Sequence, residues 1–246
     1  MRNVYFGRAG GTPPVVKNLI IINALMLLAY YALGNSLGTN LNRILGLYYF
    51  ESPYFRPYQI ITHMFMHGGV THIFFNMFAL WMFGKVLETV WGSRRFFIYY
   101  MITGLGAAFL HMIVLHIEMA PVLAQARETF GIDNFTPEIV EQLRQSGNPL
   151  AQKVAMGMWV PTVGASGAVF GVLLAFGMLF PNTQLMLLFP PIPMKAKYFV
   201  IGYGVLELYL GITQPGSNVA HFAHLGGMLF GFIMIKLWSK NRKNFF

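Results

Sequence analysis

The sequence predicts an all-α membrane protein with six transmembrane helices. Of its 246 residues, 56% are hydrophobic and only 10% are charged, whereas soluble domains carry about 25% charged residues. Six apolar stretches are long enough to cross a bilayer, which takes roughly 20 helical residues at about 1.5 Å rise each. They lie near 18–37, 70–87, 95–116, 162–180, 197–213 and 220–238. We therefore expect a single membrane domain over residues 1–246, with its core at about 15–238.

The first two spans are joined by an aromatic loop. Residues 1–18 lack the short apolar core and the cleavage site of a secretory signal, so we expect the first span to be retained. The loop at 38–69 is too rich in Tyr and Phe for a solvated linker. Aromatic side chains favour the membrane–water boundary, so we expect this loop to lie there.

The third and fourth spans are separated by the only clearly soluble segment, an outer-side insertion at about 117–157. Within it, Thr136 as a cap, Pro137 at the first helical position and Glu138 in the first turn predict a short helix, which residues 146–149 end. A proline-rich turn at 181–197 then returns the chain to the fifth span.

The net charge of +9 follows the membrane topology rather than a nucleic-acid surface. With a cytoplasmic N-terminus, six spans leave only five of the seventeen Lys and Arg residues outside: Arg43, Arg56, Arg127, Arg144 and Lys153. Cytoplasmic loops of membrane proteins carry an excess of Lys and Arg. We therefore expect both termini in the cytoplasm, a lipid bilayer as the surroundings and no nucleic-acid partner. The chain has no cysteine, which excludes disulfides and thiolate metal sites.

A few polar side chains fall within the apolar spans, where they are functional candidates because burying them in lipid is unfavourable. They are His72 and Asn76 in the second span, Ser166 in the fourth, Glu207 in the fifth, and His221 and His224 in the sixth. No aspartate lies among them. The pattern therefore favours a Ser–His dyad over a triad with aspartate.

Ser166 has two interpretations. In the first, it belongs to a stripe of small residues that starts at Gly167 and lets membrane helices pack closely. In the second, it is a nucleophile, because a matching stripe follows His224, and two facing stripes bring a hydroxyl within about 3 Å of an imidazole. A helix that begins just before Ser166 would also direct free N–H groups at a developing oxyanion.

The remaining polar residues of the spans each keep two interpretations. His72 and Asn76, four apart on one helical face, either join the second span to a neighbour or supply oxyanion donors. Between the two histidines of the sixth span, the glycines at 227 and 231 favour His224 as the base. His221 lies about one turn nearer the outer surface, as a hydrogen-bonding or interfacial residue that tunes a gate. The fifth span and the loop 214–219 are the expected lateral gate.

Two other classes of protein compete with a serine enzyme. His63 and His67 have the i, i+4 spacing of metal ligands, but no H-E-x-x-H motif occurs and no carboxylate accompanies them. We therefore expect no metal and no cofactor. A catalytically inactive protein that binds membrane helices would keep the fold and lose the dyad.

Three motifs together resemble the rhomboid family of intramembrane serine proteases. "GASG" at 164–167 resembles the family's G-x-S-G motif, and "HGGVTHIFFN" at 67–76 resembles its pattern of two histidines followed by an asparagine. "AHLGGMLFG" at 223–231 resembles A-H-x-x-G-x-x-x-G. The likeness covers about residues 15–238. It implies a six-helix rhomboid-like bundle and a serine endopeptidase that cleaves transmembrane segments of other membrane proteins.

The resemblance also implies a role for each polar residue. Ser166 becomes the nucleophile and His224 the base, while His72, Asn76 and the Ser166 N–H become the oxyanion donors. We expect the protein in a bacterial plasma membrane. In the first loop, Tyr58-Gln59 stand where the family often carries Trp-Arg.

Overall fold

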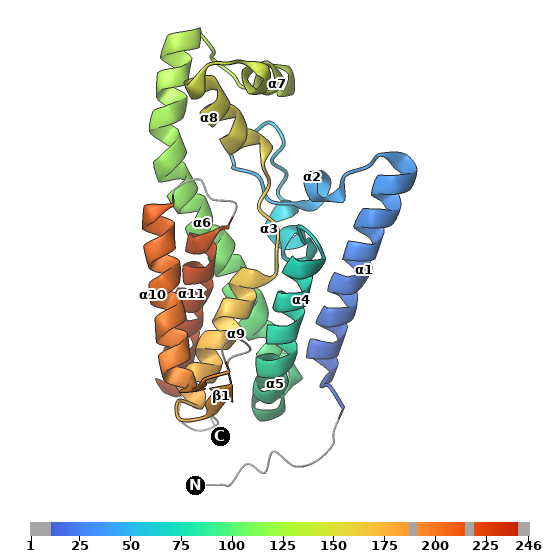
Figure 1. The fold of residues 1–246 in the computed structure, drawn as a ribbon, viewed down its shortest axis with the longest axis vertical. Coiled ribbons are helices and arrows are strands. Elements are labelled where there is room, and N and C mark those ends of the chain that lie inside the picture. Colours follow the sequence, from blue (N-terminus) through green and yellow to red (C-terminus); the bar gives the residue numbers. More distant parts are fainter. Residues whose placement is uncertain (1–10, 187–190, 215–218, 241–246) are drawn as a thin grey trace.

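The computed structural model describes residues 11–186, 191–214 and 219–240, and most of its regular structure is helical. Figure 1 shows a bundle of long helices with shorter helices at its upper end. The elements are α1 (Pro14–Leu37), α2 (Leu41–Leu45), α3 (Gln59–Thr62), η1 (His63–Phe65), α4 (Val70–Ala79), η2 (Leu80–Gly84), α5 (Lys85–Trp91), α6 (Ser93–Phe130), α7 (Pro137–Gln145), α8 (Pro149–Trp159), α9 (Ser166–Leu179), β1 (Gln184–Met186), β2 (Pro193–Lys195), α10 (Ala196–Thr213) and α11 (His221–Lys240).

The six predicted spans correspond to helices of this bundle. By length and composition, four described stretches are able to cross a membrane: Pro14–Leu37, Val70–Trp91, Ser93–Phe130 and His221–Ser239. The other two predicted spans are α9, of 14 residues, and α10, of 18 residues. The prediction of an all-α, six-helix membrane bundle is therefore confirmed. The fourth span is shorter than predicted because its helix begins only at Ser166.

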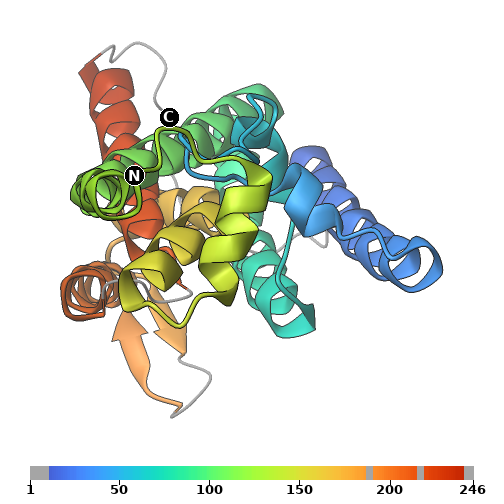
Figure 2. The ribbon, with the colours of Figure 1, turned by 90° about the horizontal axis from the view of Figure 1, so that it is seen from above.

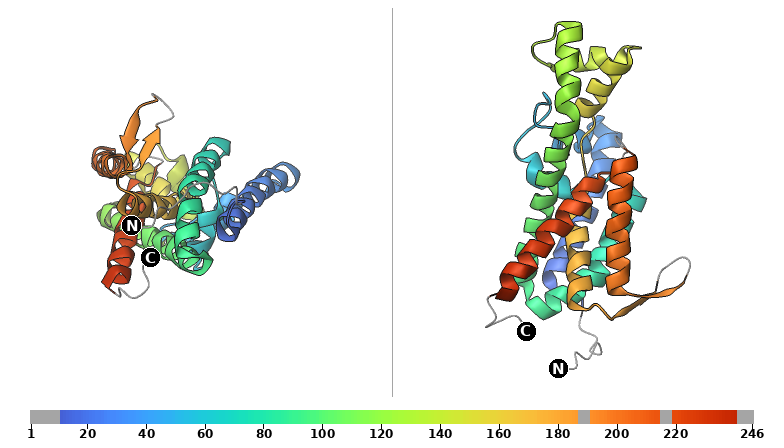
Figure 3. Two further views of the ribbon diagram at one scale, coloured as in Figure 1. Left: turned by 90° about the horizontal axis from the view of Figure 1, so that it is seen from below. Right: turned by 90° about the vertical axis from the view of Figure 1, so that its left-hand side faces the viewer.

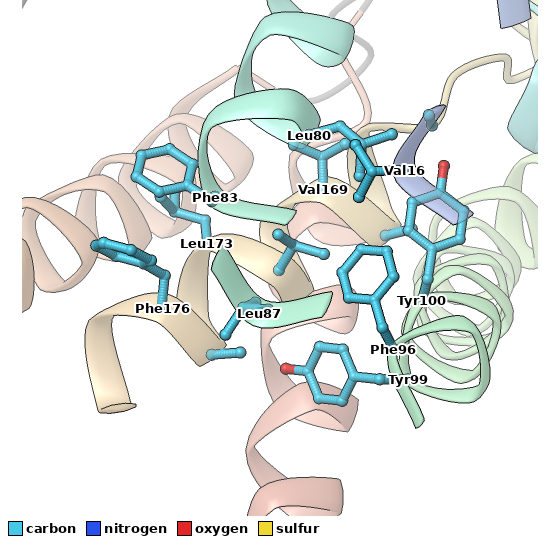
Figure 4. Packing of buried hydrophobic residues seen from close by; sticks show 14 of the residues in the cluster. Val16, Leu80, Phe83, Leu87, Phe96, Tyr99, Tyr100, Val169, Leu173 and Phe176 are labelled. Carbon is cyan, nitrogen blue, oxygen red and sulfur yellow. The ribbon is translucent and has the colours of Figure 1, made fainter. Parts of the chain in front are cut away.

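The helix α9 lies in the middle of the bundle, in contact with α4, α5, α6, α10 and α11. Most of its side chains are buried. Figure 4 shows side chains from α1, η2, α5 and α6 packed against those of α9. Seen end-on, α1 stands at one edge of the bundle (Figure 2). The core that positions Ser166 is therefore built around α9.

Two stripes of glycine bring α9 and α11 together. A Cβ atom on Gly227 of α11 would overlap the carbonyl oxygen of Gly167 in α9. One turn further, a Cβ atom on Gly231 would lie 3.4 Å from the Cα atom of Gly171. The two stripes predicted from the sequence thus face each other, and only glycine permits this backbone distance at the first pair.

A buried carboxylate fixes the start of α1. Glu88 of α5 accepts hydrogen bonds from the backbone N–H groups of Val15, at 2.9 Å, and Val16, at 2.8 Å. The hydroxyl of Ser93 donates to the same carboxylate at 2.7 Å. A negative charge at a helix N-terminus is stabilising. The start of α1 is therefore tied to the turn between α5 and α6, at the end of the bundle where α11 also ends (Figure 3).

The third helix extends well beyond its predicted end. Residue 116 was the expected limit of the span, but α6 continues to Phe130 with Pro121 inside it. The extension is stable because Met119, Leu123 and Ala126 are buried against α7 and α8 in a second hydrophobic core. Residues 117–130 of α6, together with α7 and α8, are called the outer module below.

Two helices, not one, follow in the predicted insertion. Thr136 caps α7 as predicted, since its hydroxyl accepts a hydrogen bond from the N–H of Ile139 at 3.4 Å. The segment that ends α7 also begins α8, because the Asn148 side chain accepts from the N–H groups of Leu150 and Ala151. Asn148 is therefore the N-cap of α8, a helix that was not predicted from the sequence.

The aromatic loop between α1 and α4, which we expect at the membrane–water boundary, is attached to the outer module. Tyr48 and Tyr49 are buried, at 2% and 1% exposure. Ser52 donates to the carbonyl oxygen of Met158 at 2.7 Å. The amide of Gln59, at the position where Trp-Arg is frequent in the family, donates to the carbonyl oxygens of residues 44 and 54, both at 3.1 Å. Gln59 thus anchors this loop from within.

An ion pair adds to this attachment. Arg127 of α6 lies 3.0 Å from the Glu51 carboxylate of the loop. Burial alone would raise the pKa of Glu51, but hydrogen bonds from Arg127 and Tyr49 hold it below the ordinary value of 4.5. The ionised form of Glu51 therefore stabilises the contact between the loop and the outer module.

The proline-rich connection before α10 forms a two-stranded antiparallel ribbon, β1 with β2, rather than a simple turn. Its strands pair from Gln184 with Lys195 to Met186 with Pro193. Proline is tolerated here because the ribbon contains only edge strands.

Candidate active site

Ser166 is the first residue of α9 and follows a short non-helical segment. That segment is held in place because Leu47 and Thr162 exchange two backbone hydrogen bonds, at 2.9 and 2.8 Å. Gly164 then turns the chain with a positive φ of 135°, and its N–H donates to the carbonyl oxygen of His63 at 2.9 Å. The first N–H groups of a helix have no partner within the helix. The Ser166 hydroxyl therefore lies among backbone donors.

His224 of α11 faces Ser166 across the glycine contact. Its Nε2 atom lies 2.8 Å from the Ser166 Oγ atom. The imidazole stacks on the ring of Phe170, with centroids 4.1 Å apart and planes 4° from parallel. It is 8% exposed. The stacking and the backbone contact at Gly227 leave the ring little freedom to turn away from the hydroxyl.

A carboxylate completes a chain of three residues. Glu207 of α10 accepts at Oε2 from His224 Nδ1, at 2.8 Å, and from His221 Nδ1, at 2.7 Å. Since an ionised carboxylate only accepts hydrogen bonds, both histidines carry their proton on Nδ1. The Nε2 atom of His224 is then free to accept from the Ser166 hydroxyl. A glutamate from the neighbouring helix therefore contacts the histidine of the dyad that the sequence predicts.

His221, predicted as a hydrogen-bonding or interfacial residue that tunes a gate, makes a buried hydrogen bond. It is 6% exposed and hydrogen-bonded to Glu207. Its ring meets that of His224 edge-on, with centroids 6.4 Å apart. His221 thus belongs to the same buried cluster as His224. Part of the predicted gate, residues 215–218, lies outside the described residues, while Gln214 and Val219 beside it border the cavity of the site.

His72 and Asn76 of α4 line the same cavity as Ser166 and His224. His72 Nδ1 accepts from the N–H of Gly68 at 3.3 Å, which leaves the ring proton on Nε2. A Cβ atom built on Gly164 would lie 3.0 Å from His72 Nε2 and 3.5 Å from Ser166 Oγ. The His72 donor is therefore next to the hydroxyl. The amide of Asn76 donates to the carbonyl oxygen of His72 at 2.9 Å, within its own helix.

The histidines of the competing metal hypothesis are placed differently. His63 Nδ1 bonds to the backbone carbonyl oxygen of Gln59 at 2.9 Å, and the His67 ring packs edge-on against His72, with centroids 5.0 Å apart. Among the described residues, the only group of three potential metal ligands is Glu207 with His221 and His224. These three already satisfy each other by hydrogen bonds, so the structure gives no separate reason for a metal.

The cavity at the site has a volume of about 1500 Å³. Its lower part is bordered by α4, α9, α10 and α11, and its upper part by α6 and α8 of the outer module. It therefore joins the buried Ser166 to the outer end of the bundle.

A bundle of membrane-length helices around a hydrogen-bonded serine, histidine and glutamate defines an integral, multi-pass membrane protein with a buried polar cluster. The Rhomboid domain model matches residues 54–241. The chain therefore belongs to the rhomboid family.

Several curated proteins are similar to this chain. RHOMBOID-like protein 12, mitochondrial, of Arabidopsis thaliana is 29% identical over 94% of this chain and 60% of its own length. Rhomboid protein 1, mitochondrial, of Saccharomyces cerevisiae is 28% identical over 75% of this chain and 44% of its own length. Rhomboid protease GluP of Bacillus subtilis is 24% identical over 71% of this chain and 25% of its own length. The chain thus spans less than two thirds of each relative.

The relatives bear on the membrane in which the protein lies. Two of the three proteins just described are mitochondrial by name. The comparisons therefore support an integral membrane protein and do not support the specific expectation of a bacterial plasma membrane.

Proposed function

We propose that the protein is an intramembrane serine endopeptidase that cleaves transmembrane segments of other membrane proteins. The observation that carries this proposal is the 2.8 Å contact between Ser166 Oγ and His224 Nε2 inside a membrane bundle. A hydroxyl within hydrogen-bond reach of a base, which is itself oriented by a third group, is the arrangement of an activated nucleophile. The similarity to a relative named as a rhomboid protease supports the same activity.

In the acylation step, His224 Nε2 accepts the proton of the Ser166 hydroxyl as the oxygen attacks a substrate carbonyl carbon. A bond forms between Ser166 Oγ and that carbon, and the carbonyl oxygen becomes an oxyanion. The same imidazole then gives its proton to the leaving amine as the peptide bond breaks. Water, activated by His224, releases the acyl group and restores the hydroxyl.

The oxyanion is stabilised by donors that line the same cavity as the hydroxyl. The Ser166 N–H at the start of α9 and the Nε2–H of His72 provide two such donors. Asn76 lines the cavity one turn further along α4 and is the third donor implied by the family. In the present structure its amide bonds to the His72 carbonyl oxygen, so this role requires the amide to rotate toward the substrate.

Glu207 acts as a positioning residue in this mechanism. Its carboxylate fixes the Nδ1–H tautomer of His224 through the 2.8 Å hydrogen bond and stabilises the imidazolium that forms when the serine proton is taken up. His221 donates to the same Oε2 atom at 2.7 Å and so helps to hold the carboxylate in place. The proposal therefore replaces the dyad expected from the sequence with a Ser–His–Glu arrangement.

The partners of the reaction are a lipid bilayer and membrane-protein substrates. The cavity of about 1500 Å³ gives water a route to the acylated serine from the outer end of the bundle. We further propose that both ends of the chain face the cytoplasmic side, as the distribution of Lys and Arg indicates. The mechanism requires no metal or other cofactor.

The proposed activity is tested by incubating the purified protein, in detergent and in liposomes, with a transmembrane test substrate. Wild type is expected to yield two fragments whose masses place the cut within the substrate's membrane segment. Ser166→Ala is expected to remain folded, because alanine suits the small-residue surface of α9, and to yield no fragments. Equal cleavage by both proteins, or none by wild type on any membrane substrate, contradicts the proposal.

A further inference from the structure

The cavity that holds Ser166 continues into the outer module. This part of the cavity is lined by Val114, Leu115, Ile117, Glu118, Met119 and Pro121 of α6 and by Gln152, Lys153, Met156, Gly157 and Val160 of α8 and its end. The α8 positions recur three and four residues apart and so lie on one face of that helix. We call this upper part of the cavity, between α6 and α8, the outer cleft.

The outer cleft exposes apolar side chains to water. Ile117 is 67% exposed, Met156 is 54% exposed and Val160, directly after α8, is 46% exposed. Ile117 lies 24 residues after the start of α6 at Ser93, which is about 36 Å of helix, whereas the hydrocarbon core of a bilayer is about 30 Å thick. A helix that stands upright in the bilayer would carry Ile117 past the lipid tails. Exposed apolar surface of this kind marks binding sites.

The cleft is preformed rather than flexible. A Cβ atom on Gly157 of α8 would overlap the Met119 side chain of α6, so the two helices are in close contact at its floor. Met158 and Val154 on the opposite face of α8 are buried in the second hydrophobic core. The Ser52 bond to Met158 attaches α8 to the loop as well. A rigid site binds an extended chain without paying for its own ordering.

We propose that the outer cleft binds the extended segment of the substrate that lies on the outer side of the cleaved bond. This inference rests on the proposed function, because the occupant is identified by the continuity of the cleft with Ser166. A polypeptide bound at Ser166 that leaves toward the outer side passes between α6 and α8. The two flanking charges, Glu118 and Lys153, are of opposite sign, so the cleft favours a segment with apolar side chains and little net charge.

A kinetic experiment tests this inference with two substrates that share one membrane segment. The long substrate keeps about ten residues outside the membrane, and the short substrate lacks them. Met156→Gln keeps the length of the side chain and removes its apolar end. We expect KM for the long substrate to rise about three- to tenfold. This is the change in affinity expected when roughly half of the apolar surface of a methionine side chain is no longer buried by the substrate. The effect is expected to be confined to the long substrate.

The matched control is Met186→Gln. Met186 is also exposed, at 66%, but it lies in β1, away from the cavity. It is expected to leave KM for both substrates unchanged. Equal KM values for Met156→Gln and wild type on the long substrate, or equal increases on both substrates, would overturn the inference.

A cross-linking experiment separates this inference from the proposed activity. A photo-reactive amino acid is placed at position 156, or at the control position 186, in protein that also carries Ser166→Ala. Illumination with the long substrate is expected to link position 156, and not 186, to the substrate's outer segment. This result does not depend on cleavage, so it stands or falls independently of the enzyme activity. Links from position 156 only to lipid or to a second copy of the chain contradict the inference.

Discussion

Replacing Glu207 with glutamine tests whether the carboxylate positions the base. Glutamine keeps the size of the side chain and removes its charge. A hydrogen bond to a charged group is worth about 1.5–3 kcal/mol. If the 2.8 Å bond to His224 contributes that energy in the transition state, turnover falls about 10- to 150-fold, at about 1.36 kcal/mol per tenfold change. Glu207→Ala is expected to lose more, because it leaves two buried imidazole N–H groups without an acceptor.

The assay measures kcat and KM on the transmembrane test substrate, together with the rate at which a fluorophosphonate probe labels the protein. A positioning role predicts a lower kcat and slower labelling, with KM and the thermal unfolding midpoint close to wild type for Glu207→Gln. His221→Ala is the comparison, since it keeps the bond between Glu207 and His224 and is expected to retain a measurable fraction of both activities. If Glu207→Gln cleaves and labels at wild-type rates, Glu207 has no part in the reaction.

Three further predictions concern other parts of the structure. His72→Ala and Asn76→Ala should each lower kcat about 10²- to 10³-fold, as loss of one oxyanion donor does. Full activity in both variants would show that the two residues only join helices and take no part in the reaction. Gly227→Ala should lower the thermal unfolding midpoint and abolish cleavage, because the added Cβ atom would overlap the Gly167 carbonyl oxygen. An unchanged midpoint would contradict the close contact between the glycines of α9 and α11. Because the pKa of Glu51 is lowered in the folded protein, its ionised carboxylate should stabilise the outer module above about pH 4.5. This stabilisation should be lost as the pH falls through the pKa of Glu51 in the folded protein. Glu51→Gln should remove this pH dependence of the unfolding midpoint.

Apolar length is the signal by which the sequence predicts most of the membrane helices, whereas α9 has only 14 residues. The sequence also predicts that α9 and α11 face each other, since glycines at four-residue intervals have few other uses in a membrane helix. The course of α6 past residue 116 is harder to predict. Glu118, Pro121 and Arg127 resemble the end of a span, and the helix continues only because α7 and α8 cover it.

The contact between Glu207 and the two histidines lies beyond sequence reasoning for a different reason. Helix α10 is apolar on all sides, so its pattern does not determine which face turns toward α11. A sequence signal was nevertheless present. Glu207 is the one carboxylate in the fifth span, and a buried charge requires a partner. Two histidines three residues apart on the following helix are the nearest candidates.

Labelling by a fluorophosphonate probe tests the central claim most directly, because the probe reacts only with a serine that a neighbouring base activates. Mass spectrometry of the labelled wild-type protein is expected to place the adduct on Ser166. Ser166→Ala and His224→Ala are both expected to remain folded and unlabelled. An adduct on another residue, or labelling of His224→Ala at the wild-type rate, would contradict the account.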